Sequence, residues 1–135
     1  MKLLIDANVV LDVLQNRAPH VSASRLIWKL CETEQAEGYV SALTFANLVY
    51  VMRKELTADQ IEAVLEKMKL IFRMADFTAA DLTLAARMRW DDFKDAVQSA
   101  TAERLKADYI ITRNVRDFGK SRVMALTPAE FLDRR

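Results

Sequence analysis

Short apolar runs alternate along the chain with longer segments in which apolar residues recur every three or four positions. Short apolar runs bounded by polar residues predict buried strands, and the longer periodic segments predict amphipathic helices. Strands are expected at 2–5, 38–41, 70–74, 108–112 and 123–126. Helices are expected at 8–15, from 22 or 24 onward, at 43–54, from 57 onward, at 78–90, from 91 or 92 to 106, and from 127 onward.

Several of the predicted helices carry recognisable start signals. Thr57 is followed three residues later by Gln60, the spacing of a capping box. Pro128 falls in the first turn of the last predicted helix, where its missing N–H costs nothing. Ser22 or Ser24 is expected to cap the second helix through its hydroxyl group.

Strands separated by helices predict an α/β fold in which a parallel sheet is covered by helices on both faces. No repeat, low-complexity segment or linker rich in proline and glycine divides the sequence, so one domain over residues 1–135 is expected. In such sheets, ligands bind beyond the carboxyl ends of the strands. Polar residues that directly follow a predicted strand are therefore the first candidates for a functional site.

Composition narrows the classes of function. Hydrophobic residues make up 52% of the 135 residues, which is enough for a sizeable core. The net charge of +1 argues against a protein that coats nucleic acid through bulk charge. No apolar run approaches the length of a membrane span, and Asp6 and Asp12 interrupt the apolar N-terminus, so a cytoplasmic protein without a membrane partner is expected.

Scarce residue types exclude several chemistries. With only two glycines, neither a dinucleotide fingerprint nor a phosphate-binding loop can be built. One histidine and one cysteine cannot form a structural zinc site, and no nucleophile motif accompanies the histidine. Catalysis would therefore rest on carboxylates, hydroxyls, amides and basic groups, which makes acidic residues with an oxygen-preferring metal ion the natural candidate.

Three polar segments are candidates for such a site. Asp6 and Asn8 follow the first predicted strand, Asp92 and Asp95 lie at a helix start, and a polar run follows the strand that ends near residue 112. Each segment has a purely structural explanation, because aspartate and asparagine also favour helix caps and turns. Their common location at the ends of strands and helices makes the combination more specific than any one of them.

Four segments in this order resemble the PIN domain family over essentially the whole chain. The segment Thr-Arg-Asn-Val-Arg-Asp-Phe at 112–118 is particularly specific. The four segments are Ile-Asp-Ala-Asn-Val-Val-Leu-Asp at 5–12, Asp-Phe-Lys-Asp-Ala-Val-Gln at 92–98, Asp108 to Asn114 with Asp117 and Phe118, and Leu126 to Pro128.

The resemblance implies a three-layer α/β/α sandwich around a parallel sheet of about five strands, with Mg²⁺- or Mn²⁺-dependent ribonuclease activity. Many small bacterial members are VapC-like toxins of toxin–antitoxin pairs, so an antitoxin partner and a homodimer are further expectations. Matched by position, the metal-holding catalytic residues would be Asp6, Asp95 and Asp117. The supporting polar residues would be Asn8, Thr112 and Asn114.

One position departs from the family pattern. Where members with the full acidic set carry glutamate, in a Ser-x-x-Thr-x-x-Glu arrangement, this chain has Asn47 after Ser41 and Thr44. Asparagine offers a neutral oxygen ligand but neither charge nor a general base. Asp92 is the residue that could replace the missing charge. Asn47 also favours the alternative hypothesis, a non-catalytic PIN-like domain that binds RNA or a protein partner.

The hypothesis for the chemistry is hydrolysis of RNA by water that a metal ion activates, leaving 5′-phosphate and 3′-hydroxyl ends. Clustered carboxylates repel one another, and a divalent cation relieves that repulsion. Binding of the RNA backbone needs cations beside the acidic residues. Arg113 is the first candidate for this contact, and Arg17, Arg116 and Lys120 follow it.

Overall fold

The computed structural model describes all residues from 1 to 135 and contains five strands, seven α-helices and one 3₁₀ helix. The strands are β1 (Lys2–Ile5), β2 (Glu37–Ser41), β3 (Arg73–Ala75), β4 (Tyr109–Ile111) and β5 (Ala125–Leu126). The helices are α1 (Ala7–Leu14), α2 (Val21–Glu32), α3 (Ala42–Met52), α4 (Ala58–Ile71), α5 (Ala79–Met88), α6 (Phe93–Leu105), η1 (Val115–Phe118) and α7 (Pro128–Arg134).

All five strands form one parallel sheet in the order β3-β2-β1-β4-β5. The central strand β1 pairs with β2 on one side and with β4 on the other. The order of the strands along the chain therefore reverses between β1 and β4. In open parallel sheets this reversal opens a crevice at the carboxyl ends of the two strands, which is where ligands usually bind.

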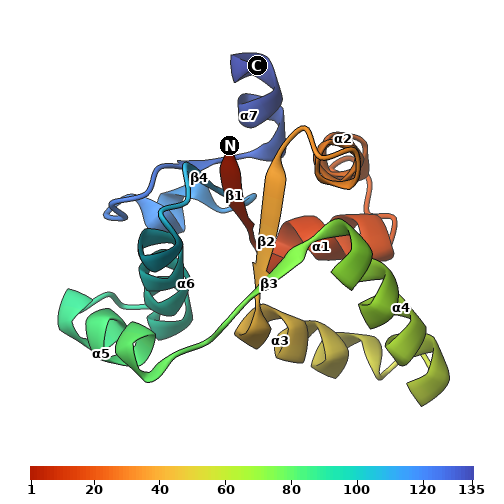
Figure 1. The fold of residues 1–135 in the computed structure, drawn as a ribbon, viewed down its shortest axis with the longest axis horizontal. Helices are drawn as coiled ribbons and strands as arrows, with labels where there is room; N and C mark the ends of the chain where they lie inside the picture. Colours follow the sequence, from red (N-terminus) through yellow and green to blue (C-terminus); the bar gives the residue numbers. More distant parts are fainter.

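Alternating side chains of the strands supply two separate cores, one on each face of the sheet. Leu3 and Ile5 of β1 join a large cluster with residues of α1, α2, α3, α4 and α7. Leu4 points to the other face, into a smaller cluster with residues of α6, η1 and β5. Figure 1 shows the same division, with α5 and α6 on one side of the strands and α1, α2 and α4 on the other. The predicted three-layer α/β/α fold with a five-stranded parallel sheet is confirmed.

Most of the predicted elements are present, with shifted ends. The capping boxes that begin α4 and α7 are both formed. The third strand is displaced to 73–75 because α4 continues to Ile71, and the last strand is reduced to two residues. None of the helices has the length and apolar character that a membrane span requires.

The predicted serine cap of the second helix is wrong. Helix α2 begins at Val21, with His20 at the N-cap position and no side-chain cap. Ser22 lies in the first turn. Ser24 is fully buried, and its hydroxyl donates to a carboxylate of α1 instead of capping the helix. A tertiary hydrogen bond has taken the place of the local one.

Candidate metal and nucleic-acid site

Asp6 lies where β1 ends and α1 begins, at the reversal point of the sheet. Its backbone N–H donates to the carbonyl of Ile111 in β4 at 2.9 Å, which extends the strand pairing by one residue. Its side chain caps α1, because Oδ1 accepts from the backbone N–H of Ala7 at 3.0 Å. The Asp6 carboxylate thus caps a helix and also lies at the edge of the sheet where ligands usually bind.

Three further side chains hold the Asp6 carboxylate, one from α1 and two from distant parts of the sequence. Thr112 Oγ1 donates to Asp6 Oδ2 at 2.8 Å, and Asn8 Nδ2 lies 3.4 Å from the same oxygen. Gln98 Nε2, from α6, donates to Oδ1 at 3.2 Å. Burial raises the pKa of Asp6, the hydrogen bonds oppose that rise, and the negative charge of Asp117 adds to it.

The segment after β4 is joined to α1 by the predicted supporting residues. Asn8 Nδ2 lies 3.3 Å from Thr112 Oγ1, and Asn8 Oδ1 accepts from the backbone N–H of Arg113 at 3.1 Å. The backbone N–H of Asn114 donates to Thr112 Oγ1 at 3.1 Å. Asn8 and Thr112 therefore connect Asp6 to the loop that leads to Asp117. The Asn114 side chain makes no hydrogen bond and is exposed.

Asp92 and Asp95 lie at the start of α6. Asp92 is the N-cap, and its Oδ1 accepts from the backbone N–H of Asp95 at 3.1 Å. Burial, the largest cause, and the negative charges of Asp92, Asp6 and Asp117 together raise the pKa of Asp95 to about 6. Because part of this rise comes from repulsion among neighbouring carboxylates, a cation placed between them would be stabilising.

A cavity of about 400 Å³ opens beside Asp95 and Asp117. It lies between the connection from α5 to α6 and the η1 segment, and it contains both acidic and basic groups. Its lining residues are Trp90, Asp91, Asp92, Asp95, Arg116, Asp117, Gly119 and Lys120.

The acidic residues are of the right chemical type to bind a divalent ion, but they are too far apart in this structure to form its site. Carboxylate oxygens are the ligands that Mg²⁺ and Mn²⁺ prefer, and the like charges of Asp6, Asp95 and Asp117 influence one another. However, no three acidic, histidine or cysteine side chains come close enough together to hold a metal ion. The predicted residues thus share one electrostatic environment without the close contact of a formed metal site.

Asn47 lies on α3, near this network but outside its hydrogen bonds. Ser41 caps α3 through the backbone N–H of Thr44, and Thr44 Oγ1 lies 3.5 Å from Gln98 Nε2. Asn47 follows Thr44 by three residues and so lies on the same side of the helix. Its half-buried side chain makes no hydrogen bond with the residues around Asp6.

Gln98 and Thr44 are members of the site that the sequence did not single out. Gln98 is buried and is the only side chain of α6 that bonds to Asp6. A sequence signal existed, because Gln98 follows Asp95 by three residues and must lie on the same helical face. Its partner could not be read from the sequence, since the two bonded residues are 92 positions apart.

Two of the predicted RNA contacts, Arg113 and Arg17, have partners within the protein. Arg113 Nε lies 3.1 Å from Oδ2 of Asp12, and its side chain is 27% exposed. Asp12 is fully buried on α1. The Arg17 guanidinium donates to the side-chain carbonyl of Gln15. Of the cations near the acidic residues, only Arg116 and Lys120 line the cavity itself.

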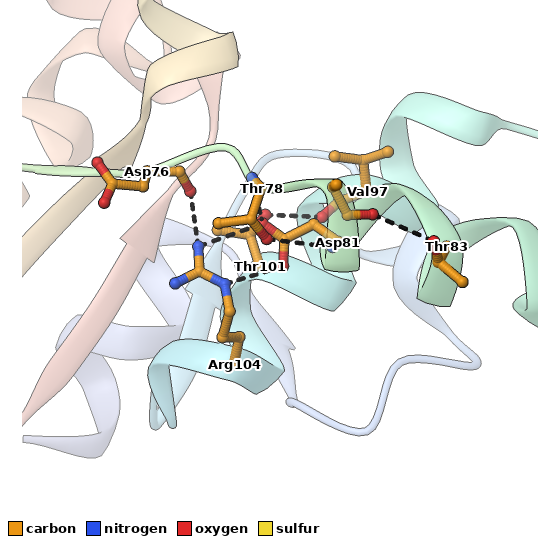
Figure 2. Close-up of polar contacts among 8 residues, drawn as sticks. Asp76, Thr78, Asp81, Thr83, Val97, Thr101 and Arg104 are labelled. Atoms are coloured by element: carbon orange, nitrogen blue, oxygen red, sulfur yellow. Dashed lines mark hydrogen bonds and ion pairs between the residues drawn. The ribbon is translucent and has the colours of Figure 1, made fainter.

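An ion pair joins α5 to α6, the two helices whose connection contributes to the cavity wall. Arg104 of α6 donates through Nε to Asp81 Oδ1 at 2.9 Å and through Nη2 to Oδ2 at 3.2 Å. A further bond of 2.6 Å joins Nη2 to the carbonyl of Asp76, before α5 (Figure 2). Asp81 also completes the capping box of α5 with Thr78. Asp91 and Asp92 lie in the turn between these two helices.

Solved structures with this fold include toxins and their complexes. The toxin–antitoxin complex from Klebsiella pneumoniae matches with a TM-score of 0.69 at 21% identity, over 93% of this chain and 97% of that chain. VapBC-1 from nontypeable Haemophilus influenzae gives 0.72 at 18%, over 96% and 99%. VapC20 from Mycobacterium tuberculosis, described as a sarcin-ricin loop cleaving toxin, gives 0.63 at 12%, over 80% and 86%. At these identities the likeness shows a shared fold.

The sequence gives a more specific result than these structures. None of the curated protein sequences matches the chain. The model of the PIN domain, however, matches residues 2–116, which include Asp6, Asp95 and the whole segment that follows β4 as far as Arg116. On this match over most of its length, the chain belongs to the PIN domain family.

Proposed function

We propose that this protein is a Mg²⁺- or Mn²⁺-dependent endoribonuclease and the toxin of a bacterial toxin–antitoxin pair. The observation that carries the proposal is the Asp6 carboxylate, held by four hydrogen bonds at the reversal point of the sheet. The charges of Asp95 and Asp117 act on the same site. A divalent cation would relieve the repulsion among these carboxylates, and carboxylate oxygens are the ligands that it prefers.

Asp6, Asp95 and Asp117 would hold the ion, with Asp92 and Asn47 as further oxygen donors. Bound there, the ion supplies a Lewis acid that favours ionisation of water and neutralises charge on the reacting phosphate. Water attacks phosphorus, the bond from phosphorus to the 3′ oxygen breaks, and that oxygen takes a proton. The products carry 5′-phosphate and 3′-hydroxyl ends.

The polar neighbours of Asp6 have a positioning function in this proposal. Thr112, Asn8 and Gln98 restrict the carboxylate to one orientation, so that little reordering is needed when the cation binds. Arg116 and Lys120 supply positive charge within the acidic cavity and would contact the RNA backbone. Arg17 stays a candidate contact, whereas the charge of Arg113 already faces an acid inside the protein.

The role as a toxin rests on the fold and family. The match covers 97% and 99% of one chain in a toxin–antitoxin complex and in a VapBC structure from two bacteria, and one similar toxin is described as cleaving the sarcin-ricin loop. An antitoxin protein is therefore the proposed partner, together with a second copy of the chain as a homodimer. Asn47 marks this protein as a variant in which the second acidic ligand is neutral.

A cleavage assay with purified protein and a structured RNA tests the catalytic proposal. We expect cleavage with Mg²⁺ or Mn²⁺, none with a chelator, and at least a hundredfold loss in Asp95→Asn. Asp133→Asn makes the same exchange on the exposed face of α7 and serves as the matched control. Products with 2′,3′-cyclic phosphate ends, or activity that persists in chelator, would contradict the proposed chemistry.

Asn47 distinguishes the alternative, a PIN domain that binds RNA or protein without cutting. Asn47→Glu restores the acidic residue of the family pattern and should raise the cleavage rate from a measurable baseline. If the wild type does not cleave and Asn47→Glu creates the activity, the natural protein is a binding domain. If neither the wild type nor Asn47→Glu cleaves RNA although both bind it, the site lacks more than one ligand, and the catalytic proposal is wrong.

A further inference from the structure

A fully buried carboxylate lies outside the acidic cavity and takes no part in the proposed chemistry. Asp12 of α1 accepts a hydrogen bond from Ser24 Oγ of α2 at 3.2 Å, and its Oδ2 lies 3.1 Å from Arg113 Nε. Its other oxygen, Oδ1, has no hydrogen-bond partner. Asp12 is therefore a buried acid whose main partner is a single arginine of the segment after β4.

The geometry of this ion pair makes it a weak source of stability. Two charges removed from water recover their desolvation cost only with good hydrogen-bond geometry and complete pairing. Here Asp12 Oδ1 is unpaired, and the Nε–H group of Arg113 is buried without a well-directed hydrogen bond. Violations of such packing rules concentrate at functional sites, where position matters more than stability.

Helix α1 holds Arg113 at two points. Asn8 accepts from the backbone N–H of Arg113 at 3.1 Å, and Asp12, four residues later on the same helical face, pairs with its side chain. The neighbouring Thr112 donates to Asp6 at 2.8 Å, and the amide of Asn114 donates to Thr112. The orientation of residue 113 is thus coupled to the residues that hold Asp6.

We infer that the Asp12–Arg113 pair is a positioning device for the proposed nuclease site. It fixes residues 112–114 against α1, and through them the orientation of Asp6 and the direction in which the chain continues to Asp117. In this role the Arg113 side chain binds Asp12 within the protein and does not make the contact with an RNA phosphate that the sequence predicts. The effect of this pair on catalysis rests on the proposed function, whereas its ordering of residues 112–114 does not.

Four variants test this inference in the full-length protein. Asp12→Asn and Arg113→Met each break the pair, Asp12→Leu with Arg113→Met replaces it by apolar groups, and Arg122→Gln removes an exposed arginine as the control. The cleavage rate at saturating RNA, the dissociation constant for RNA over a range of salt, and the thermal unfolding midpoint are measured for each. Catalysis, RNA binding and folding are thereby separated.

We expect Asp12→Asn and Arg113→Met to lower the cleavage rate about tenfold or more, the usual effect of losing an outer partner of a metal-site ligand. RNA affinity and its salt dependence should stay as in the wild type. The doubly apolar variant should unfold at a temperature no lower than that of the wild type, yet cleave as slowly as the single variants. Slow cleavage in a stable protein is a result that a merely structural pair would not give.

Two results would overturn the inference. If Arg113→Met weakens RNA binding and lowers the salt slope by about one, while Asp12→Asn cleaves normally, then Arg113 contacts a phosphate. If Asp12→Asn lowers the unfolding midpoint but leaves the rate per folded molecule unchanged, then the pair serves stability alone.

Amide hydrogen exchange separates this inference from the proposed function. If the wild type has no nuclease activity, the proposed function fails, but the amides of Arg113 and Asn114 still report on the order of the segment. Their protection should fall about tenfold in Asp12→Asn and stay unchanged in Arg122→Gln. Equal protection in the wild type and Asp12→Asn would show that the pair positions nothing.

Discussion

Replacement of Arg104 by methionine tests how strongly one ion pair holds α5 against α6. Methionine keeps an unbranched stem that packs along the helix but removes all three hydrogen bonds to Asp81 and Asp76. The Asp81 side chain is only 2% exposed. In the variant, the one hydrogen bond left to its carboxylate would come from the backbone N–H of Thr78. The fold would lose stability because a buried charge is left without its cation.

The expected loss of unfolding free energy in Arg104→Met follows from how far the pair is buried. Removing one partner of a fully buried pair costs about 3–5 kcal/mol, and exposed pairs contribute about 0–1 kcal/mol. The Arg104 side chain is 34% exposed, so water reaches this pair from one side. We therefore expect a loss of about 2 kcal/mol, which is about 7 °C in the unfolding midpoint of a 135-residue protein.

The dependence of this loss on pH has a defined sign. Burial alone would raise the pKa of Asp81, but the hydrogen bonds from Arg104 and Thr78 lower it overall. The pair therefore stabilises the fold above the unfolded-state pKa of 3.8, and this stabilisation is lost as the pH falls through the folded-state value. The difference between wild type and Arg104→Met should accordingly be largest at neutral pH and smaller in acid.

Urea unfolding of both proteins, followed by circular dichroism at neutral pH and at a series of pH values below 3.8, measures this difference directly. Arg122→Met is the matched control, because Arg122 pairs with Glu103 and its side chain is 83% exposed. A loss below about 0.5 kcal/mol, equal to that of the control, would show that solvent screens the Arg104 pair. A difference that does not change with pH would refute the assignment of the loss to the Asp81 charge.

Three further predictions concern the site and the core. In metal-free protein the pKa of about 6 at Asp95 lies above the ordinary 3.8, so stability falls as the pH rises through that range. After discounting for solvent, the wild type should lose about 1 kcal/mol of unfolding free energy relative to Asp95→Asn between pH 4 and pH 7, and Mn²⁺ should reverse this loss. Gln98→Leu should lower the cleavage rate about tenfold without lowering RNA affinity, because it leaves Asp6 Oδ1 with only its bond to the Ala7 N–H; an unchanged rate would deny Gln98 this function. Gly38→Ala should cost about 1–3 kcal/mol, since a Cβ there would lie 2.5 Å from Cys31 Sγ, and the cost should be smaller in a Cys31→Ala background if that contact is its cause.

The sequence by itself determined most of the elements and the edge of the sheet at which the proposed site lies. The periods of apolar residues located five strands and seven helices, because side-chain burial repeats every two residues in strands and every three to four in helices. The capping boxes at Thr57 and Thr127 were equally readable, since donor and acceptor lie within four residues of each other. Asp6 was located at the ligand-binding edge by the strand that precedes it.

Only the tertiary structure decided which partner each polar side chain has. Gln98 bonds to Asp6, Ser24 to Asp12, and Arg113 pairs with Asp12, over separations that no local pattern reports. Ser24 shows the consequence, because a helix cap was predicted where the fold provides a buried hydrogen bond. Arg113, predicted to contact RNA, has an acidic partner within the protein. Local propensity is set by neighbours in sequence, whereas the energy of a polar group depends on burial and on the groups packed around it.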